Sequence, residues 1–140
     1  KKMGRVFFDT RKNIVDITAA ITILPGDSGN VFMINQGAAY AITLPAPALA
    51  QRGWNAEFIV GTVASNAQTI TCVGTDLFHG LGIDGEDGAA QTVTEGTGID
   101  VITIISGATK GDRVTIECDG VHYYYQAFAA DAAHITVAAE

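Results

Sequence analysis

The stretch NAEFIVGTVASNAQTITCV, residues 55–73, decides the fold class, because polar and apolar side chains alternate along both of its halves. In the first half, Ala56, Phe58 and Val60 lie on one face of an extended chain, as residues two apart do in a β-strand. The Ser-Asn pair at positions 65–66 is typical of a turn. We therefore expect residues 55–73 to form a β-hairpin.

The same two-residue period recurs along most of the chain. A second hairpin is predicted over residues 111–128, with Asp119-Gly120 as its turn. Further alternating or apolar segments are residues 13–24, 40–45, 99–106 and 134–137. Short strands at regular spacing predict an all-β fold, a single-domain antiparallel β-sandwich or barrel over residues 13–140, preceded by an N-terminal arm of residues 1–12.

Two segments depart from this period. Residues 45–53, PAPALAQRG, predict one or two helical turns that end at Gly53. Residues 74–98 are rich in glycine and acidic side chains and have no strong period. We expect them to form a long loop with one short strand near residues 91–93.

The composition suggests a surface that other chains partly cover. Of the 140 residues, 48% are hydrophobic and 16% are charged, whereas about 25% is the usual charged share. A small domain has much surface to cover, so this deficit favours a homo-oligomer, for which we expect a homotrimer. Apolar runs are too short for a transmembrane helix, and no membrane partner is expected.

Charge is divided unevenly between the arm and the domain. Residues 1–12 carry five basic side chains and one acidic side chain, for a net charge of +4, and the remaining residues carry a net charge of −11. An acidic body repels phosphates, which argues against nucleic acid as a partner. The arm has two interpretations: a solvated chain end, or a segment that docks on an acidic surface of a neighbouring protein.

No cofactor or metal site is predicted. Cys72 and Cys118 each end an alternating run, so we expect two buried free thiols, with a disulfide between neighbouring strands as the alternative. Two cysteines without paired histidines do not make a structural zinc site. Asp84, Glu86 and Asp87 could bring oxygen ligands to Ca²⁺, but they lack the spacing of an EF-hand, and a solvated loop is expected instead.

The tetrapeptide Gly-Asp-Ser-Gly at positions 26–29 matches the sequence around the nucleophile of chymotrypsin-like serine proteases. Chain order argues against that chemistry, because His79, His122 and His134 all follow Ser28, whereas the protease order is His, Asp, Ser. Pro, Gly, Asp and Ser are also the residues of a turn. We therefore expect a turn before an apolar strand, no catalytic residue, and no enzymatic activity.

The aromatic residues have both structural and binding interpretations. Tyr123 and Tyr125 should point to one face of a strand, and His122 and Tyr124 to the other. Exposed rings on a β-sandwich could stack on sugar rings, although packing in the core or between subunits is the commoner use. Trp54 follows a glycine at a strand entrance and is expected to anchor the core.

The order of four short motifs resembles a module of tailed-bacteriophage structural proteins. The motifs are Asp27-Ser28-Gly29, Thr43-Leu44-Pro45-Ala46-Pro47, Gly111-Asp112 and Asp119-Gly120, within residues 24–128. The chain departs from that module at His122-Tyr123, where the family often has an Asn-Trp pair. The resemblance implies a head decoration (cement) protein or a part of a tail or head fibre, and it brings no catalytic residues.

The resemblance, supported by the low charge content and the basic arm, implies a non-enzymatic virion protein that is assembled in the host cytoplasm and binds the outer surface of a phage capsid, with the major capsid protein as its partner. The alternative is a tail or head fibre module that binds a host surface glycan through residues 123–125. The residues expected to contact the capsid are Lys1, Lys2, Arg5, Phe7, Phe8, Arg11 and Lys12. The residues expected at an oligomer interface are Val101, Ile102, Ile104, Ile105, Tyr123, Tyr124 and Tyr125.

Overall fold

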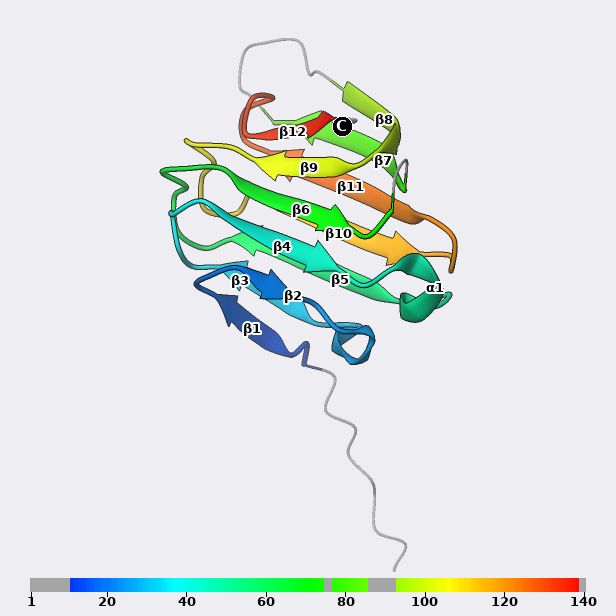
Figure 1. Ribbon diagram of the computed structural model, residues 1–140. Helices are drawn as coiled ribbons and strands as arrows, with labels where there is room; N and C mark the ends of the chain where they lie inside the picture. The colour runs from blue at the N-terminus through cyan, green and yellow to red at the C-terminus, as the bar shows by residue number, and fades with distance from the viewer. Residues whose placement is uncertain (1–10, 75–76, 86–92, 139–140) are drawn as a thin grey trace, which may run out of the picture.

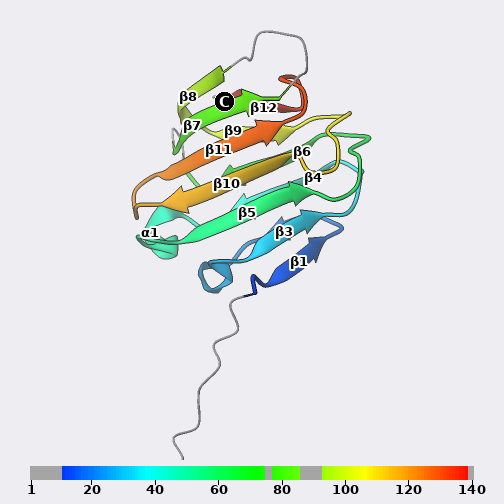
Figure 2. The same ribbon diagram turned by 180° about the vertical axis from the view of Figure 1, so that it is seen from behind.

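Two β-sheets packed face to face make up nearly all of the structure, a computed structural model that describes residues 11–74, 77–85 and 93–138 (Figures 1 and 2). The all-β sandwich is therefore confirmed. Both sheets are mixed rather than purely antiparallel, because five of the strand pairs, including β1 with β3 and β4 with β6, run parallel.

The seven-stranded sheet is seen from its outer side in Figure 2, and the five-stranded sheet in Figure 1. In spatial order the first contains β1 (Ile14–Ile17), β3 (Val31–Ile34), β5 (Asn55–Val60), β10 (Arg113–Cys118), β11 (Tyr123–Ala129), β7 (Phe78–Asp84) and β8 (Val93–Ile99). The second contains β12 (Ile135–Ala138), β9 (Val101–Ile104), β6 (Gln68–Cys72), β4 (Tyr40–Leu44) and β2 (Ile21–Thr22).

From β1 to β6 the chain winds as a coil, because each successive strand joins the opposite sheet. The predicted hairpin over residues 55–73 is therefore wrong: β5 and β6 lie in different sheets. The connection between β5 and β6 is bound to other loops. The Ala64 amide donates to the Ala108 carbonyl, and the Asn66 amide donates to the Gly37 carbonyl. An alternating strand has the same pattern whether its successor lies beside it or across the core.

The second predicted hairpin is confirmed, because β10 and β11 pair antiparallel around Asp119-Gly120. Gly120 has a φ of 93° there, which glycine tolerates best.

The long loop predicted over residues 74–98 is wrong, since most of the described part forms β7 and β8. In β7, Gly80 lies so close to the Tyr125 carbonyl that a Cβ atom would overlap it, so this glycine permits close strand packing.

The core lies between the sheets and consists of rows of large apolar side chains. Ile42, Ile70 and Ile102 occupy matching positions on β4, β6 and β9 and are completely buried. Trp54 anchors the core as predicted, with its ring edge-on to Tyr123 at a centroid separation of 5.7 Å.

The predicted helical turns form α1 (Pro47–Ala50). No helix in the described ranges is long and apolar enough to cross a membrane.

Candidate functional site

Ser28 lies in a turn, as predicted. Pro25–Asp27 form one turn of 3-10 helix, in which the Leu24 amide donates to the Asp27 carboxylate at 2.8 Å. The Ser28 hydroxyl accepts a hydrogen bond from the Asn55 amide at 3.2 Å. This bond links the turn before β3 to the start of β5, so the Ser28 hydroxyl has a structural role.

Asp112 is a buried carboxylate that accepts hydrogen bonds from several residues, and the sequence analysis did not single out this role. It is buried and accepts hydrogen bonds from the amides of Thr109 and Ala130, each at 2.8 Å. His134 Nδ1 also lies 2.8 Å from it. Asp112 thereby ties the connection before β10 to the connection between β11 and β12. The sequence feature that could have predicted this role is the position of Asp112 directly after Gly111, at the start of a strand.

Cys72 and Cys118 are both free thiols, the first half-buried and the second buried. They lie on β6 and β10, which belong to opposite sheets, so the alternative of a disulfide between neighbouring strands is wrong. Burial raises the pKa of Cys72 to about 11, with a smaller contribution from the Asp100 carboxylate. Burial also raises the pKa of Cys118. Both side chains are therefore neutral near pH 7.

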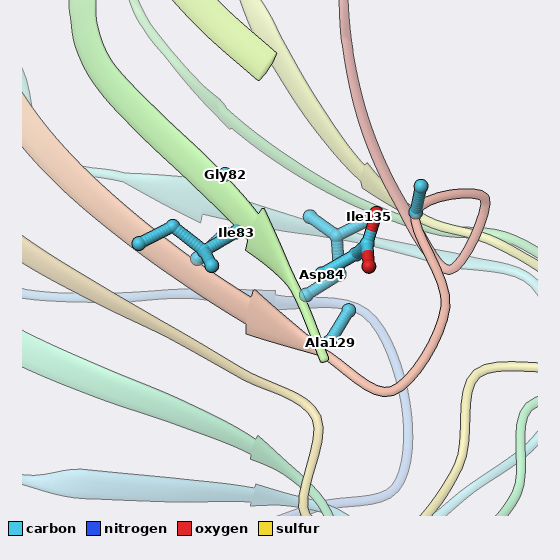
Figure 3. A pocket seen from close by; sticks show the side chains of 7 residues that line it. Gly82, Ile83, Asp84, Ala129 and Ile135 are labelled. Atoms are coloured by element: carbon cyan, nitrogen blue, oxygen red, sulfur yellow. The ribbon is translucent and has the colours of Figure 1, made fainter. Parts of the chain in front are cut away.

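Asp84 is the described member of the acidic trio once considered for Ca²⁺. Its side chain is buried at the end of β7 and points into a small pocket beside Ala129 and Ile135 (Figure 3). The pocket has a volume of about 10 Å³, which is at the limit for a single water molecule. Glu86 and Asp87 lie outside the described residues. Within those ranges no group of His, Cys, Asp and Glu side chains is arranged to hold a metal ion.

The structure describes only the last part of the predicted capsid-binding arm. Lys1, Lys2, Arg5, Phe7 and Phe8 lie outside the described residues. Arg11 and Lys12 are exposed next to β1, at one edge of the seven-stranded sheet.

Lys12 is fixed against the sheet. Its Nζ lies 2.8 Å from Glu57 Oε2 on β5, and Arg113 Nη1 lies 3.4 Å from the other oxygen of the same carboxylate. The arm therefore joins the domain through a residue that already has an ion-pair partner.

The residues predicted for an oligomer interface divide between the core and the surface. Ile102, Ile104, Tyr123 and Tyr125 are buried between the sheets, so their side chains are not available to another chain, and this part of the prediction is wrong. The reason is the alternation itself, which turns every second residue of β9 and β11 inward. Val101, Ile105 and Tyr124 lie on the outer surface and stay candidates.

The outer surface of β10, β11 and β7 bears a groove of about 310 Å³. The strand register places Glu117, Tyr124 and His79 in one row across these strands, and Thr115, Gln126 and Leu81 in the next. Tyr124 is 48% exposed. The His79 and Tyr124 ring centroids are 6.0 Å apart, and the His79 ring meets His122 edge-on at 4.9 Å.

Hydrogen bonds hold the rings beside this groove. The Tyr124 hydroxyl donates to Asp119 Oδ2 at 3.1 Å, which raises the pKa of Tyr124. Asp119 accepts the amides of His122 and Val121, and these bonds lower its pKa, so it is ionised near neutral pH. The Gly98 amide donates to His79 Nδ1 at 3.2 Å. A nitrogen that accepts a hydrogen bond is unprotonated, so neutral His79 carries its proton on Nε2.

The outer surface of the five-stranded sheet is different, because its strands, all within the described ranges, contain no charged residue. By the strand register, two rows of small, mostly β-branched side chains cross it. One row is Thr22, Thr43, Thr71, Val101 and Ala138, and the other is Ala41, Thr69, Thr103 and Thr136. We call this surface the threonine face.

Comparison of the chain with known protein families, with curated proteins and with solved structures finds no match.

Proposed function

We propose that the protein is a non-enzymatic virion component that binds the outer surface of a phage capsid and stabilises it, and that it does so as a homotrimer with the major capsid protein as its partner. The observation that carries this proposal is the threonine face, an uncharged surface that spans five strands of a small acidic domain. Cores of protein interfaces are depleted of charge in the same way.

The threonine face suits contact with a second copy of the chain. Its side chains are short and mostly β-branched, so they lose little rotamer freedom on burial. Threonine hydroxyls can also form hydrogen bonds across an interface while their methyl groups pack. An acidic domain repels its own copies over most of its surface, and a face without carboxylates is where that repulsion is smallest.

The basic arm supports the capsid as the second partner. Residues 1–12 carry a net charge of +4 on a body of −11, so the arm is the part of the chain that an acidic capsid surface attracts. It joins the domain beside β1, at the opposite edge of the seven-stranded sheet from β7 and β8. A domain anchored there extends the β7 end away from the capsid, as a decoration protein or a short head fibre does.

Binding to capsids tests this proposal. Purified heads that lack the protein are mixed with the full chain and with a variant lacking residues 1–9, and bound protein is measured by sedimentation at several salt concentrations. We expect the full chain to bind, with an affinity that falls as salt rises, and the truncated chain to lose most binding. A matched variant with Lys1, Lys2, Arg5, Arg11 and Lys12 replaced by Gln separates charge from the apolar contribution of Phe7 and Phe8.

Two results would contradict the proposal. The first is equal binding of the full and truncated chains to heads, which would remove the arm from the contact. The second is density for the chain on the tail rather than the head in cryo-electron microscopy of virions that contain it, which would favour the tail fibre module.

A further inference from the structure

The groove on the seven-stranded sheet has the dimensions and lining of a small-ligand site. Its volume of about 310 Å³ lies at the lower end of the usual range for ligand sites, about 300–1,000 Å³. Its walls combine rings, one aliphatic side chain and several polar groups. The side chains that the argument uses are His79, Leu81, Thr115, Glu117, Tyr124 and Gln126.

Each ring of the aromatic wall takes part in a hydrogen bond within the protein. The His79 and Tyr124 rings lie on paired positions of β7 and β11, with centroids 6.0 Å apart and planes inclined by 34°. Tyr124 is held through Asp119 and His79 through the Gly98 amide. A ligand that stacks on these rings therefore does not have to immobilise them, which favours binding.

The polar wall offers hydrogen-bonding groups that the protein does not use. In the described part of the chain, the side chains of Thr115, Glu117 and Gln126 form no hydrogen bond with another residue. The Glu117 carboxylate accepts only, whereas the Thr115 hydroxyl and the Gln126 amide both donate and accept. These groups suit a ligand that carries several hydroxyl groups as well as a flat apolar surface.

A pyranose ring has this combination, with C–H groups on its face and hydroxyl groups around its edge. Charge narrows the choice, because Glu117 lines the groove and ionised Asp119 lies behind Tyr124. These carboxylates repel sialic and uronic acids. We propose that the groove binds one ring of a neutral pyranose sugar, stacked on Tyr124 and His79 and hydrogen bonded by Thr115, Glu117 and Gln126.

The sugar site does not depend on capsid binding, and it is tested with the isolated protein. Of the three consecutive tyrosines, Tyr124 has the ring that is exposed at the groove, whereas Tyr125 lines the groove but is buried and Tyr123 is buried in the core. In the proposed anchored orientation the groove lies on the half of the sheet farther from the arm, where a sugar on a cell surface can reach it.

The experiment is titration of the isotope-labelled full chain with cellotriose, maltotriose and chitotriose, followed by amide chemical shifts. We expect at least one of these neutral trisaccharides to shift the amides of β7, β10 and β11, with a Kd of about a millimolar. Sialyllactose and trigalacturonic acid, titrated in parallel, should bind at least about tenfold more weakly, since both are anionic.

Variants on one strand give a matched comparison. Tyr124→Ala should weaken binding at least about tenfold through loss of stacking. Phe128→Ala removes a ring that is similarly exposed on the same face of β11 but does not line this groove, and it should change the affinity less than about twofold. Tyr124→Phe keeps the ring and should retain most of the binding.

Three results would overturn the proposal. They are the absence of groove shifts with all three neutral sugars at about 20 mM, equal weakening by Tyr124→Ala and Phe128→Ala, and tighter binding of the anionic sugars. Spectra of the free variants show whether each remains folded, and Tyr124→Phe repeats the test of the groove with the ring in place. A loss of capsid binding in the arm variants leaves all of these outcomes unchanged, so the two proposals fail separately.

Discussion

The outer faces of the two sheets differ although both cover the same core. The threonine face has short side chains and no charge on its strands. The seven-stranded face carries Asp16, Glu57, Arg113 and Glu117 together with the exposed rings of Tyr124 and Phe128. Strands alternate in the same way on both sides, so the identity of the outward residues, rather than the fold, distinguishes a surface suited to protein contact from one suited to a small polar ligand.

The largest expected effect comes from placing the same change on both faces. Thr71 lies on β6, the central strand of its sheet, and Thr115 lies on β10, the central strand of the other. Thr71→Lys puts a charge into the proposed trimer interface, which costs several kcal/mol when the charge has no partner. We expect trimer association to weaken at least about a hundredfold, as measured by sedimentation velocity.

The control is Thr115→Lys, which should leave the trimer intact and abolish sugar binding by filling the groove. If the wild-type chain sediments as a monomer at micromolar concentration, or if both lysine variants remain trimeric, the functional contrast between the two faces is wrong.

The next effect concerns Asp112, the buried carboxylate that links the connection before β10 to the connection between β11 and β12. Asp112→Ala leaves the Thr109 and Ala130 amides without their acceptor and removes the partner of His134. An unsatisfied buried donor costs about 1–3 kcal/mol, so we expect the free energy of unfolding to fall by about 2–4 kcal/mol. Urea denaturation measures it.

Asp16→Ala is the matched control for Asp112→Ala. Asp16 accepts a hydrogen bond from the Asn35 side chain, but the pair is exposed at the edge strand β1. We expect a cost below about 1 kcal/mol. Equal costs for the two aspartates would show that Asp112 does not have the structural role that its contacts indicate.

Alkaline pH should destabilise the interior that separates the two faces. The pKa of Cys72 is about 9 when exposed and about 11 in the folded protein, because burial favours the neutral thiol. Its contribution to stability is therefore fully present below pH 9 and is lost as the pH rises through about 11. Burial raises the pKa values of Cys118, Tyr123 and Tyr125 in the same direction. Melting temperatures measured from pH 7 to pH 11 should fall above pH 9.

In Cys72→Ala this alkaline decline should be shallower than in the wild type, because one group that releases its proton on unfolding is gone. An unchanged slope would indicate that Cys72 ionises equally in the folded and unfolded chains.

The smallest effect is expected at the turn beside β3. Ser28→Ala removes one acceptor for the Asn55 amide, in an exposed hydrogen bond. We expect a loss of about 0.5–1 kcal/mol of stability, with oligomer state and sugar binding unchanged. Labelling of Ser28 by a fluorophosphonate probe would contradict the structural interpretation and indicate a nucleophile.

Alternation in the sequence predicted which side chains point inward, but not which strands are neighbours. Ile42 and Ile70, like Tyr123 and Tyr125, are buried as the two-residue period indicates, and Asp119-Gly120 marks a real hairpin turn. The sequence pattern could not predict which strands pair with β5, because that pairing depends on contacts between loops distant in sequence.

Glycine produced the other error in the fold, and the groove was missed for a related reason. Glycines such as Gly80 made the composition of this segment typical of a loop. In β7, however, Gly80 allows close packing against β11. The groove combines residues of three strands, and β7 was not recognised as a strand, so His79 and Leu81 could not be placed beside Tyr124. Tyr124 itself was predicted to face away from Tyr123 and Tyr125, which is confirmed.

The position of β10 has a consequence for the order of events during synthesis. β10 is inserted between β5 and β11, so one edge of β5 stays unpaired until residues 113–118 have left the ribosome. The coil formed by β1 to β6 can assemble earlier, but its open edge then presents unpaired backbone groups of the kind that template aggregation. In a nascent chain, the open edge of β5 is therefore covered, and protected from aggregation, only when the last quarter of the chain has emerged from the ribosome.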